Sequence, residues 1–232
     1  MEISRSLKLI LILQVIFLPN AWSDADWVAK RLNEPLEVKP SRLEQISDFL
    51  INRIPPLELP SSAEAWTAEA QTLRDRILEE VVFKGVPDSW REGNHSVTWG
   101  DTIETGKGYK IRKLSYECLP GLHISALLYE PENLIGKVPA ILNVNGHNAP
   151  GKSRDVEQIR CINLAKRGML ALHPEWLSFG DLETYELRHN RGAYLDMCGI
   201  SSLATFYLAM RGGLDVLLAH EHANPNRVAM TG

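Results

Sequence analysis

The feature that most constrains the fold is a short apolar run at 138–144, which is nearly continuous and is bounded by Gly136 and Gly146. A strand with one solvated face alternates apolar and polar residues, so a nearly continuous apolar run of this length indicates a strand that is covered on both faces. Helices on both sides of a sheet provide such cover in α/β proteins. The run therefore predicts a buried strand inside an α/β sheet.

The segments on either side of this run support the same interpretation. Upstream, the range 109–128 alternates apolar and polar residues around a Pro-Gly turn, which predicts an antiparallel hairpin. Downstream, an amphipathic segment at 155–167 leads to an apolar run at 169–172, and a mostly helical segment at 200–220 leads to a short strand at 227–231. This alternation predicts a doubly wound, mostly parallel sheet.

Details of these segments make the prediction specific. Gly212 and Gly213 are expected to interrupt the long helical segment, and Pro225 with Asn226 is expected to form a turn before the last strand. The apolar side chains at helical spacing in 155–167 are expected to form its packed face: Val156, Ile159, Ile162 and Ala165.

The N-terminal residues have the layout of a secretory signal peptide. Two basic residues precede an apolar run at 9–18, and small residues follow the helix-breaking Pro19. The run is shorter than the roughly 20 apolar residues that a membrane span needs. We therefore expect a signal peptide at 1–23 with cleavage after Ser23, no stable membrane anchor, and a secreted or periplasmic protein.

The segment 24–90 is expected to be helical and to serve packing rather than chemistry. Ser41 and Glu44 have the spacing of a capping box, which marks the start of a helix. A second helix is predicted at 62–84, where apolar residues share a face and Gly85 can cap the end.

Charge and cysteine content exclude several classes of function. The 25 Lys and Arg residues are scattered among 29 Asp and Glu residues and give a net charge of −4, so nucleic acid is not an expected partner. The spacings of Cys118, Cys161 and Cys198 fit neither a disulfide framework nor a structural zinc site. His220 and His222 are two residues apart, whereas zinc proteases use a spacing of four, so a solvated or capping role is expected. No metal or cofactor is predicted.

Three segments follow or form the ends of the predicted strands, where doubly wound sheets bind their ligands. The first, 145–152, reads NGHNAPGK and follows the buried strand directly. The second, 173–181, reads HPEWLSFGD. The third, 224–232, reads NPNRVAMTG and contains the last predicted strand.

In order and spacing, the range 110–232 resembles the acetylxylan esterase group of α/β-hydrolases, which includes carbohydrate deacetylases. The resemblance implies that 91–232 is a partial α/β-hydrolase domain whose oxyanion loop follows the buried strand. Gly146 would permit a sharp turn there, and the backbone N–H of His147, with Asn148 as the second candidate, would face the carbonyl oxygen of the substrate. The alternative is a polar turn in which His147 and Asn148 are merely solvated.

The resemblance also implies a role for the last residue of the sequence. Gly232 would be the first glycine of a nucleophile elbow, GxSxG, in which the serine follows two positions later. The serine, and the histidine and acid of its triad, are therefore expected beyond Gly232. Asn145 stands where the family often has a histidine. Trp176 is a candidate for stacking on a sugar ring, with packing at the edge of the core as the alternative.

The implied function is that of a secreted carboxylic ester hydrolase, an acetylxylan esterase-like serine hydrolase that acts on a small-molecule or polysaccharide ester. These 232 residues are expected to be a fragment that is inactive alone. One alternative is a serine peptidase of the prolyl-oligopeptidase type, against which the lack of a propeller preface speaks. The other is a non-catalytic binding protein, if the chain is complete.

Overall fold

The computed structural model describes residues 18–35, 41–56, 58–93, 96–184 and 188–232. The chain divides into two compact units, Met1–Leu59 and Pro60–Gly232. Most of the expected signal peptide, 1–17, lies outside the described residues. In the part of the chain that the structure describes, no helix combines the length and the apolar character that a membrane span requires.

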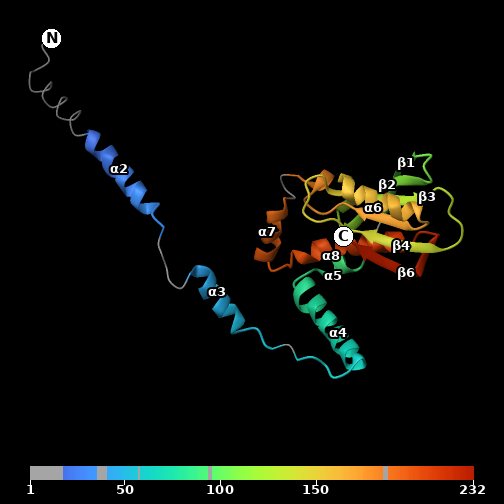
Figure 1. The fold of residues 1–232 in the computed structure, drawn as a ribbon, viewed down its shortest axis with the longest axis horizontal. Helices are drawn as coiled ribbons and strands as arrows, with labels where there is room; N and C mark the ends of the chain where they lie inside the picture. The colour runs from blue at the N-terminus through green and yellow to red at the C-terminus, as the bar shows by residue number, and fades with distance from the viewer. Residues whose placement is uncertain (1–17, 36–40, 57, 94–95, 185–187) are drawn as a thin grey trace, which may run out of the picture. The chain divides into compact units, whose positions relative to one another are not determined.

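The first unit contains helices α2 (Leu18–Leu32) and α3 (Arg42–Ile51) (Figure 1). The predicted capping box at the start of α3 is confirmed: the Ser41 hydroxyl accepts a hydrogen bond from the Glu44 N–H at 3.2 Å, and the Glu44 carboxylate accepts one from the Ser41 N–H at 2.6 Å. These hydrogen bonds hold the pKa of Glu44 below its usual range. No residue of α3 is buried, so the packing expected for this helix is not observed among the described residues.

The second unit begins with helix α4 (Ala63–Ile77), which continues as a π-helical turn at Leu78–Val82. The Ser62 hydroxyl caps α4 by accepting a hydrogen bond from the Ala65 N–H at 3.1 Å. Gly85 ends the segment with a φ of 69°, as expected for a glycine cap. A short helix, α5 (Asp88–Arg91), follows. The predicted helix at 62–84 is therefore confirmed.

Within the described residues, six strands form one sheet in the order β1-β2-β3-β5-β4-β6. Their bounds are β1 (Val97–Glu104), β2 (Tyr109–Leu119), β3 (Leu122–Pro131), β4 (Val138–Asn143), β5 (Leu170–Pro174) and β6 (Ala223–Thr231). The hairpin β2–β3 and the buried strand β4 are where the sequence predicts them. The α/β class is confirmed, and the sheet is mixed: β4 is parallel to β5 and β6, whereas β1, β2, β3 and β5 pair antiparallel.

Helices α6 (Asp155–Lys166) and α8 (Leu203–Leu218) cover opposite faces of this sheet (Figure 1). Successive residues of a strand point to opposite faces. Accordingly, Leu170 and Leu172 of β5 pack in the core cluster that contains α8, and Ala171 between them packs in the cluster that contains α6. The short helix α7 (Gly192–Met197) precedes α8.

The predicted packed face of α6 is wrong in part, because Ala165 is buried and Ile162 packs against the same cluster, but the other two predicted residues are exposed. Val156 and Ile159 are 52% and 57% exposed, whereas the buried residues of the helix are Glu157, Cys161 and Ala165. The actual face is rotated by about one residue, or roughly 100°. Hydropathy alone missed it because the buried face contains a carboxylate and a thiol, and Glu157 accepts a hydrogen bond from Arg154 at 3.2 Å.

The expected interruption of the long helix is also wrong, because α8 runs unbroken through Gly212 and Gly213. A Cβ atom at Gly213 would lie 2.8 Å from the Tyr116 hydroxyl and 2.9 Å from the ring of Pro174. This glycine therefore lets the helix approach the sheet closely. The predicted turn at 225–226 lies inside the bounds of β6, where Asn226 N–H donates to the Asn224 side chain at 3.0 Å and the register with β4 shifts.

Candidate functional site

The carboxyl ends of β4 and β6 meet directly. Asn143 is paired with Thr231, and the Val144 N–H donates to the Thr231 carbonyl at 2.8 Å. The next residue, Gly232, is so close to β4 that a Cβ atom would lie 2.8 Å from the Val144 side chain. Any residue that follows Gly232 therefore starts beside the loop that follows β4.

The loop after β4 distinguishes between the two candidate N–H groups. The Asn148 N–H donates to the Gly146 carbonyl at 2.9 Å, so it is used inside the loop. The His147 N–H has no hydrogen bond within the described residues, and His147 is exposed. Of the two, the His147 N–H is the group that can donate to an incoming oxygen.

The backbone at Gly146 does not adopt a conformation that favours glycine. The sharp turn is present, but Gly146 does not have a positive φ. A Cβ atom at this position would meet only the Asn148 side chain, at 3.9 Å. The observed turn therefore does not itself require a glycine.

Two histidine rings meet at the outer side of this loop. The Nε2 atoms of His147 and His189 are 3.1 Å apart, which places one ring as donor and the other as acceptor. Phe179 packs edge-on against His147 with ring centroids 5.3 Å apart, and His189 packs against Phe206 of α8 at 5.5 Å. The side chain of the oxyanion-donor candidate is thus packed against residues from two later segments.

A partly buried ionic cluster, which we call the Glu175 clasp, lies under the same loop and consists of Ser125, Lys152, Glu175 and the exposed Asp181. Glu175 is fully buried and accepts hydrogen bonds from the Lys152 ammonium at 3.0 Å, the Lys152 N–H at 2.9 Å and the Trp176 N–H at 3.1 Å. The Lys152 ammonium also donates to Asp181 at 2.6 Å and to Ser125 at 3.1 Å. Sequence analysis missed this cluster.

Two glycines make room for the buried carboxylate. Gly151 and Gly180 have φ values of 54° and 53°, and a Cβ atom on either would lie 2.1 Å from a Glu175 carboxylate oxygen. In addition, the Gly180 N–H donates to the Ala149 carbonyl at 3.2 Å. The clasp therefore binds the loop after β4 to the loop after β5.

The pKa values of the two carboxylates of the clasp are shifted in opposite directions. Burial raises the pKa of Glu175 against the opposing effect of the Lys152 ammonium. Burial also acts to raise the pKa of Asp181, but hydrogen bonds from Lys152 and Ser125 hold this pKa below its usual range. Asp181 is the carboxylate that carries the negative charge opposite Lys152 over the wider pH range.

A third buried group, His173 at the end of β5, has unusual properties. Both of its ring nitrogens are buried without a hydrogen-bond partner among the described residues, as are side-chain atoms of Asn143 and Asn145. Burial, together with the positive charges of Lys152 and Arg160, lowers the pKa of His173 from 6.5 to about 4. The ring is therefore neutral at physiological pH.

His173 is expected to make the fold sensitive to acid. The unfolded side chain takes up a proton below about pH 6.5, whereas the folded one does so only below about pH 4, so stability falls as the pH falls through this window. The expected loss is about 3 kcal/mol. Urea unfolding at pH 7, 5 and 4 should show a smaller loss for His173→Gln, while the exposed control His123→Gln behaves as the unmodified chain. Equal acid losses in all three proteins would contradict this prediction.

Trp176 lies at the edge of the core. Its ring is half-buried and packs against Phe206 with centroids 5.1 Å apart, and its Nε1 atom is buried without a hydrogen-bond partner among the described residues. The observed contact is thus a packing contact.

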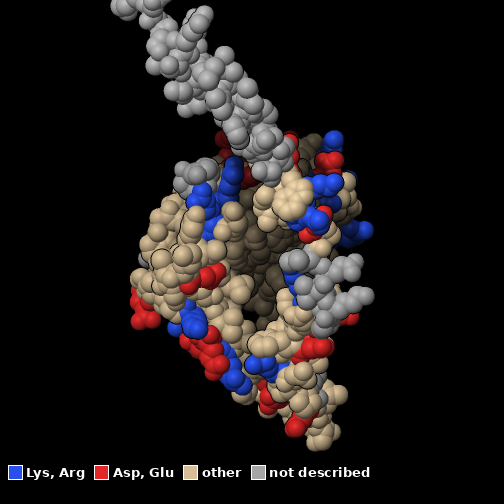
Figure 2. Space-filling view, turned by 90° about the vertical axis from the view of Figure 1, so that its left-hand side faces the viewer, with Lys and Arg blue, Asp and Glu red and all other residues tan. Residues whose placement is uncertain are grey.

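The remaining polar groups form no metal site in the part of the chain that the structure describes. His220 is partly buried rather than solvated, and its Nε2 atom lies 2.9 Å from the buried carboxylate of Glu130. His222 makes a separate hydrogen bond to the Gly136 carbonyl at 2.8 Å. On the face shown in Figure 2, charged side chains of both signs are interspersed.

The cysteines of the described residues are free thiols. Cys118 and Cys161 are buried, and burial raises the pKa of each to about 12. Cys198 is exposed. The two buried thiols are therefore unreactive packing groups.

No protein-family model and no curated protein matches this sequence. Among solved structures, the chain is similar to a Bacteroides fragilis NCTC 9343 protein assigned as an acetyl xylan esterase, with a TM-score of 0.67 and 20% identity over 86% of this chain and 56% of that one. It is also similar to the methylesterase BT1017, with a TM-score of 0.59 and 23% identity over 82% of this chain and 39% of that one.

A third similar structure is acetyl xylan esterase 1 from Thermoanaerobacterium sp. JW/SL YS485, with a TM-score of 0.50 and 16% identity over 62% of this chain and 47% of that one. This chain thus spans between 39% and 56% of the length of these proteins. At such identities the likeness establishes the fold, and this chain has the fold of the α/β-hydrolase esterases.

Proposed function

We propose that this chain is part of a carboxylic ester hydrolase, an acetylxylan esterase-like serine hydrolase, and that it contributes the oxyanion loop of the active site. The observation that carries the proposal is the meeting of two strand ends: the His147 N–H stands in the loop after β4, and Gly232 lies against Val144 at the end of β6. In an α/β-hydrolase the nucleophile elbow follows this strand and faces the oxyanion loop.

In the proposed reaction, a serine two positions after Gly232 attacks the acyl carbon of the ester, and a histidine that is paired with an acid takes up its proton. The histidine then gives this proton to the alcohol that leaves as the ester bond breaks, and water hydrolyses the acyl-serine to release the acid. The His147 N–H, with Asn148 as the second candidate, stabilises the negative charge on the carbonyl oxygen. The open Cβ position of Gly146 leaves space beside this donor for the substrate. The chemistry needs no cofactor.

The proposal extends to the rest of the chain. Residues 1–23 act as a signal peptide, 24–90 form a helical segment, and 91–232 form part of the hydrolase domain, so the protein is secreted or periplasmic. The substrate is a small-molecule or polysaccharide ester, and Trp176 offers an aromatic surface near the site for a sugar ring. The names of the similar structures, two acetyl xylan esterases and a methylesterase, support the ester class.

These 232 residues alone are expected not to hydrolyse p-nitrophenyl acetate above the buffer rate. An oxyanion donor without a nucleophile leaves the attack on the acyl carbon uncatalysed. The measurement is the rate of nitrophenolate release by the purified chain at pH 7 to 8. Hydrolysis that disappears when a residue within the chain is replaced would contradict the proposal.

The positive test uses the gene product that contains the elbow serine. It should hydrolyse the same ester, and replacing that serine by alanine should abolish the activity. Preferential cleavage of a prolyl peptide would favour the peptidase alternative. Binding of a sugar with no cleavage of either substrate would favour the non-catalytic alternative.

A further inference from the structure

A cavity of about 290 Å³ lies in the second unit, beside α7 and the start of α8. Leu122, Leu177 and Leu195 line it together with the ring of Phe206. Ligand sites in proteins are typically concave and mostly apolar. An apolar cavity of about 150 Å³ is large enough to bind benzene, so this one has room for a single ring with a short substituent.

Charged and polar side chains of the cavity wall are already used within the chain. The Arg191 guanidinium donates to the Tyr194 hydroxyl at 2.9 Å and lies over the Tyr194 ring, 5.2 Å from its centroid. Arg188 also has an interaction partner. The Thr205 hydroxyl donates to the Ser202 carbonyl at 2.8 Å. Because these groups are engaged, the lining favours an uncharged ligand over an ionised one.

Among the described residues of the cavity wall, three carry aromatic rings, namely His189, Tyr194 and Phe206. His189 packs edge-on against Phe206 with ring centroids 5.5 Å apart, and Trp176 packs against Phe206 at 5.1 Å. Aromatic rings in such arrangements stabilise one another beyond the burial of apolar area. A sugar ring would instead bury its hydroxyl groups against an apolar wall, which is unfavourable. The lining therefore favours an aromatic ring.

The cavity wall also contains a strained residue, Ser178. It has a φ of 72° and is the one non-glycine residue with a positive φ among the described residues. Of its two neighbours in the chain, Leu177 lines the cavity and Phe179 packs against His147. Backbone strain of this kind concentrates at ligand sites, where the surrounding structure maintains it.

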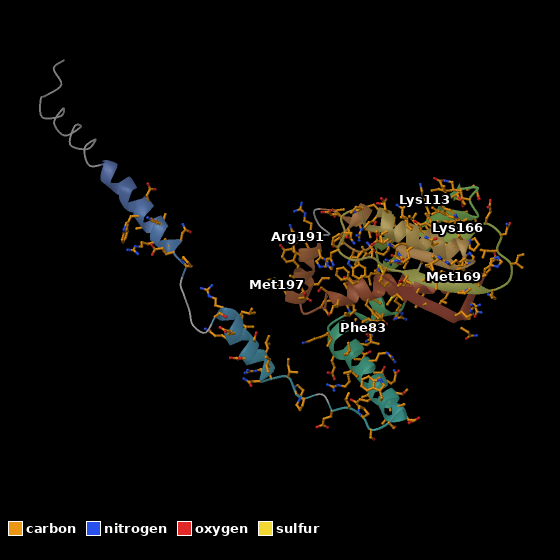
Figure 3. The ribbon with its side chains drawn as sticks, viewed as in Figure 1. Phe83, Lys113, Lys166, Met169, Arg191 and Met197 are labelled. Atoms are coloured by element: carbon orange, nitrogen blue, oxygen red, sulfur yellow. The ribbon has the colours of Figure 1, made fainter. Side chains whose placement is uncertain are left out.

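The cavity adjoins the loop after β4 through His189. This residue lines the cavity, and its Nε2 atom lies 3.1 Å from that of His147. Figure 3 shows Arg191, another lining residue, at the α7 end of the unit, far from Lys166 and from Met169, which precedes β5. The cavity is therefore at the carboxyl ends of the parallel strands, next to the candidate oxyanion donor.

We propose that this cavity binds an uncharged aromatic ring, and that this ring is the aryl part of an aromatic ester whose carbonyl group lies beside the His147 N–H. The assignment of the ring to the ester rests on the proposed function and names a narrower class of substrate. The binding of the ring does not rest on it. The two proposals can therefore fail separately.

The test is an NMR titration of the 232-residue chain with acetophenone, a ketone that cannot be hydrolysed, so that binding is measured without catalysis. Acetophenone should bind saturably and about tenfold or more tightly than methyl glucoside, whose hydroxyl groups would lose their water. It should also bind about twofold or more tightly than cyclohexyl methyl ketone, which has a saturated ring. No saturable binding of acetophenone, or an equal affinity for either comparison compound, overturns the proposal.

Matched variants locate the binding site. Leu195→Asn places an amide in the cavity wall and should weaken acetophenone binding about tenfold or more, because the ligand would desolvate that amide. The control Met197→Asn introduces the same amide on α7 at a residue that is 82% exposed and outside the cavity wall, and it should leave the affinity unchanged.

A second variant, Phe206→Leu, keeps the wall apolar but removes a ring, and it should weaken binding about twofold or more. Circular dichroism establishes which variants are folded, and Phe206→Leu decides the outcome if Leu195→Asn is not. An affinity in the folded cavity variants equal to that of Met197→Asn and the unmodified chain overturns the assignment to this cavity.

Discussion

Gly180→Ala is expected to lower the free energy of unfolding by about 2–5 kcal/mol. A positive φ costs a residue with a Cβ atom about 1–2 kcal/mol, and forcing extra volume into a packed interior adds about 1–3 kcal/mol. At this position φ is 53°, and the new methyl group would lie 2.1 Å from the buried Glu175 carboxylate. Urea unfolding followed by circular dichroism measures the loss.

The control for this prediction is Gly106→Ala. Gly106 has a similar φ of 62°, but a Cβ atom there would have no neighbour within 4 Å. This variant isolates the backbone cost of about 1–2 kcal/mol. Equal losses in the two variants would mean that the Glu175 clasp does not resist the added volume.

His147→Pro is expected to lower the turnover number of the gene product that contains the elbow serine by about 10²- to 10³-fold. Proline has no N–H, so this substitution removes the proposed oxyanion donor. The loss should appear in kcat more than in KM, because the bond is strongest in the transition state. Steady-state hydrolysis of p-nitrophenyl acetate measures both constants.

The matched control is His147→Ala, which removes the ring but retains the N–H. Its turnover should stay within about tenfold of the unmodified enzyme, since the donor is a backbone group. Equal losses in the two variants would assign the role to the imidazole, and an unchanged rate in His147→Pro would move the donor elsewhere, with Asn148 as the next candidate.

The Glu175 clasp supports the loop after β4 in the way that the proposed oxyanion role requires. A donor stabilises a transition state only when it is already oriented, and loops need support from neighbouring groups to stay so. Here the support comes from the fully buried Glu175 carboxylate, which accepts hydrogen bonds from both the side chain and the N–H of Lys152. Lys152 lies in the same loop, four residues after Asn148. The His147 to His189 contact adds a second point of attachment.

Local sequence patterns predicted local structure well. The capping box at Ser41, the hairpin β2–β3 and the buried strand β4 are each determined by residues that are close together in the chain. The buried face of α6 and the unbroken course of α8 depend instead on what packs against them. From the sequence alone, Gly213 is expected to break the helix. In the structure it lets α8 pack closely against Tyr116 and Pro174, where a side chain would not fit.

The candidate site was predicted only in part for the same reason. The loop after β4 could be located because it directly follows a strongly apolar strand. The clasp could not, because its four residues come from three segments, and only the fold brings Ser125 and Lys152 to the segment that contains Glu175 and Asp181. The sequence feature that relates to the clasp is the pair of glycines Gly151 and Gly180. Their lack of a side chain leaves room for the Glu175 carboxylate, but this is evident only from the structure.

The most direct test of the central claim is to read the coding sequence beyond the codon for Gly232. The account predicts a frame that continues with one residue, a serine, one residue and a glycine, followed later by an acid and a histidine. That result would place a nucleophile beside the His147 N–H. A stop codon directly after Gly232 would contradict the account, because the chain would then have an oxyanion donor and no elbow serine to attack the ester.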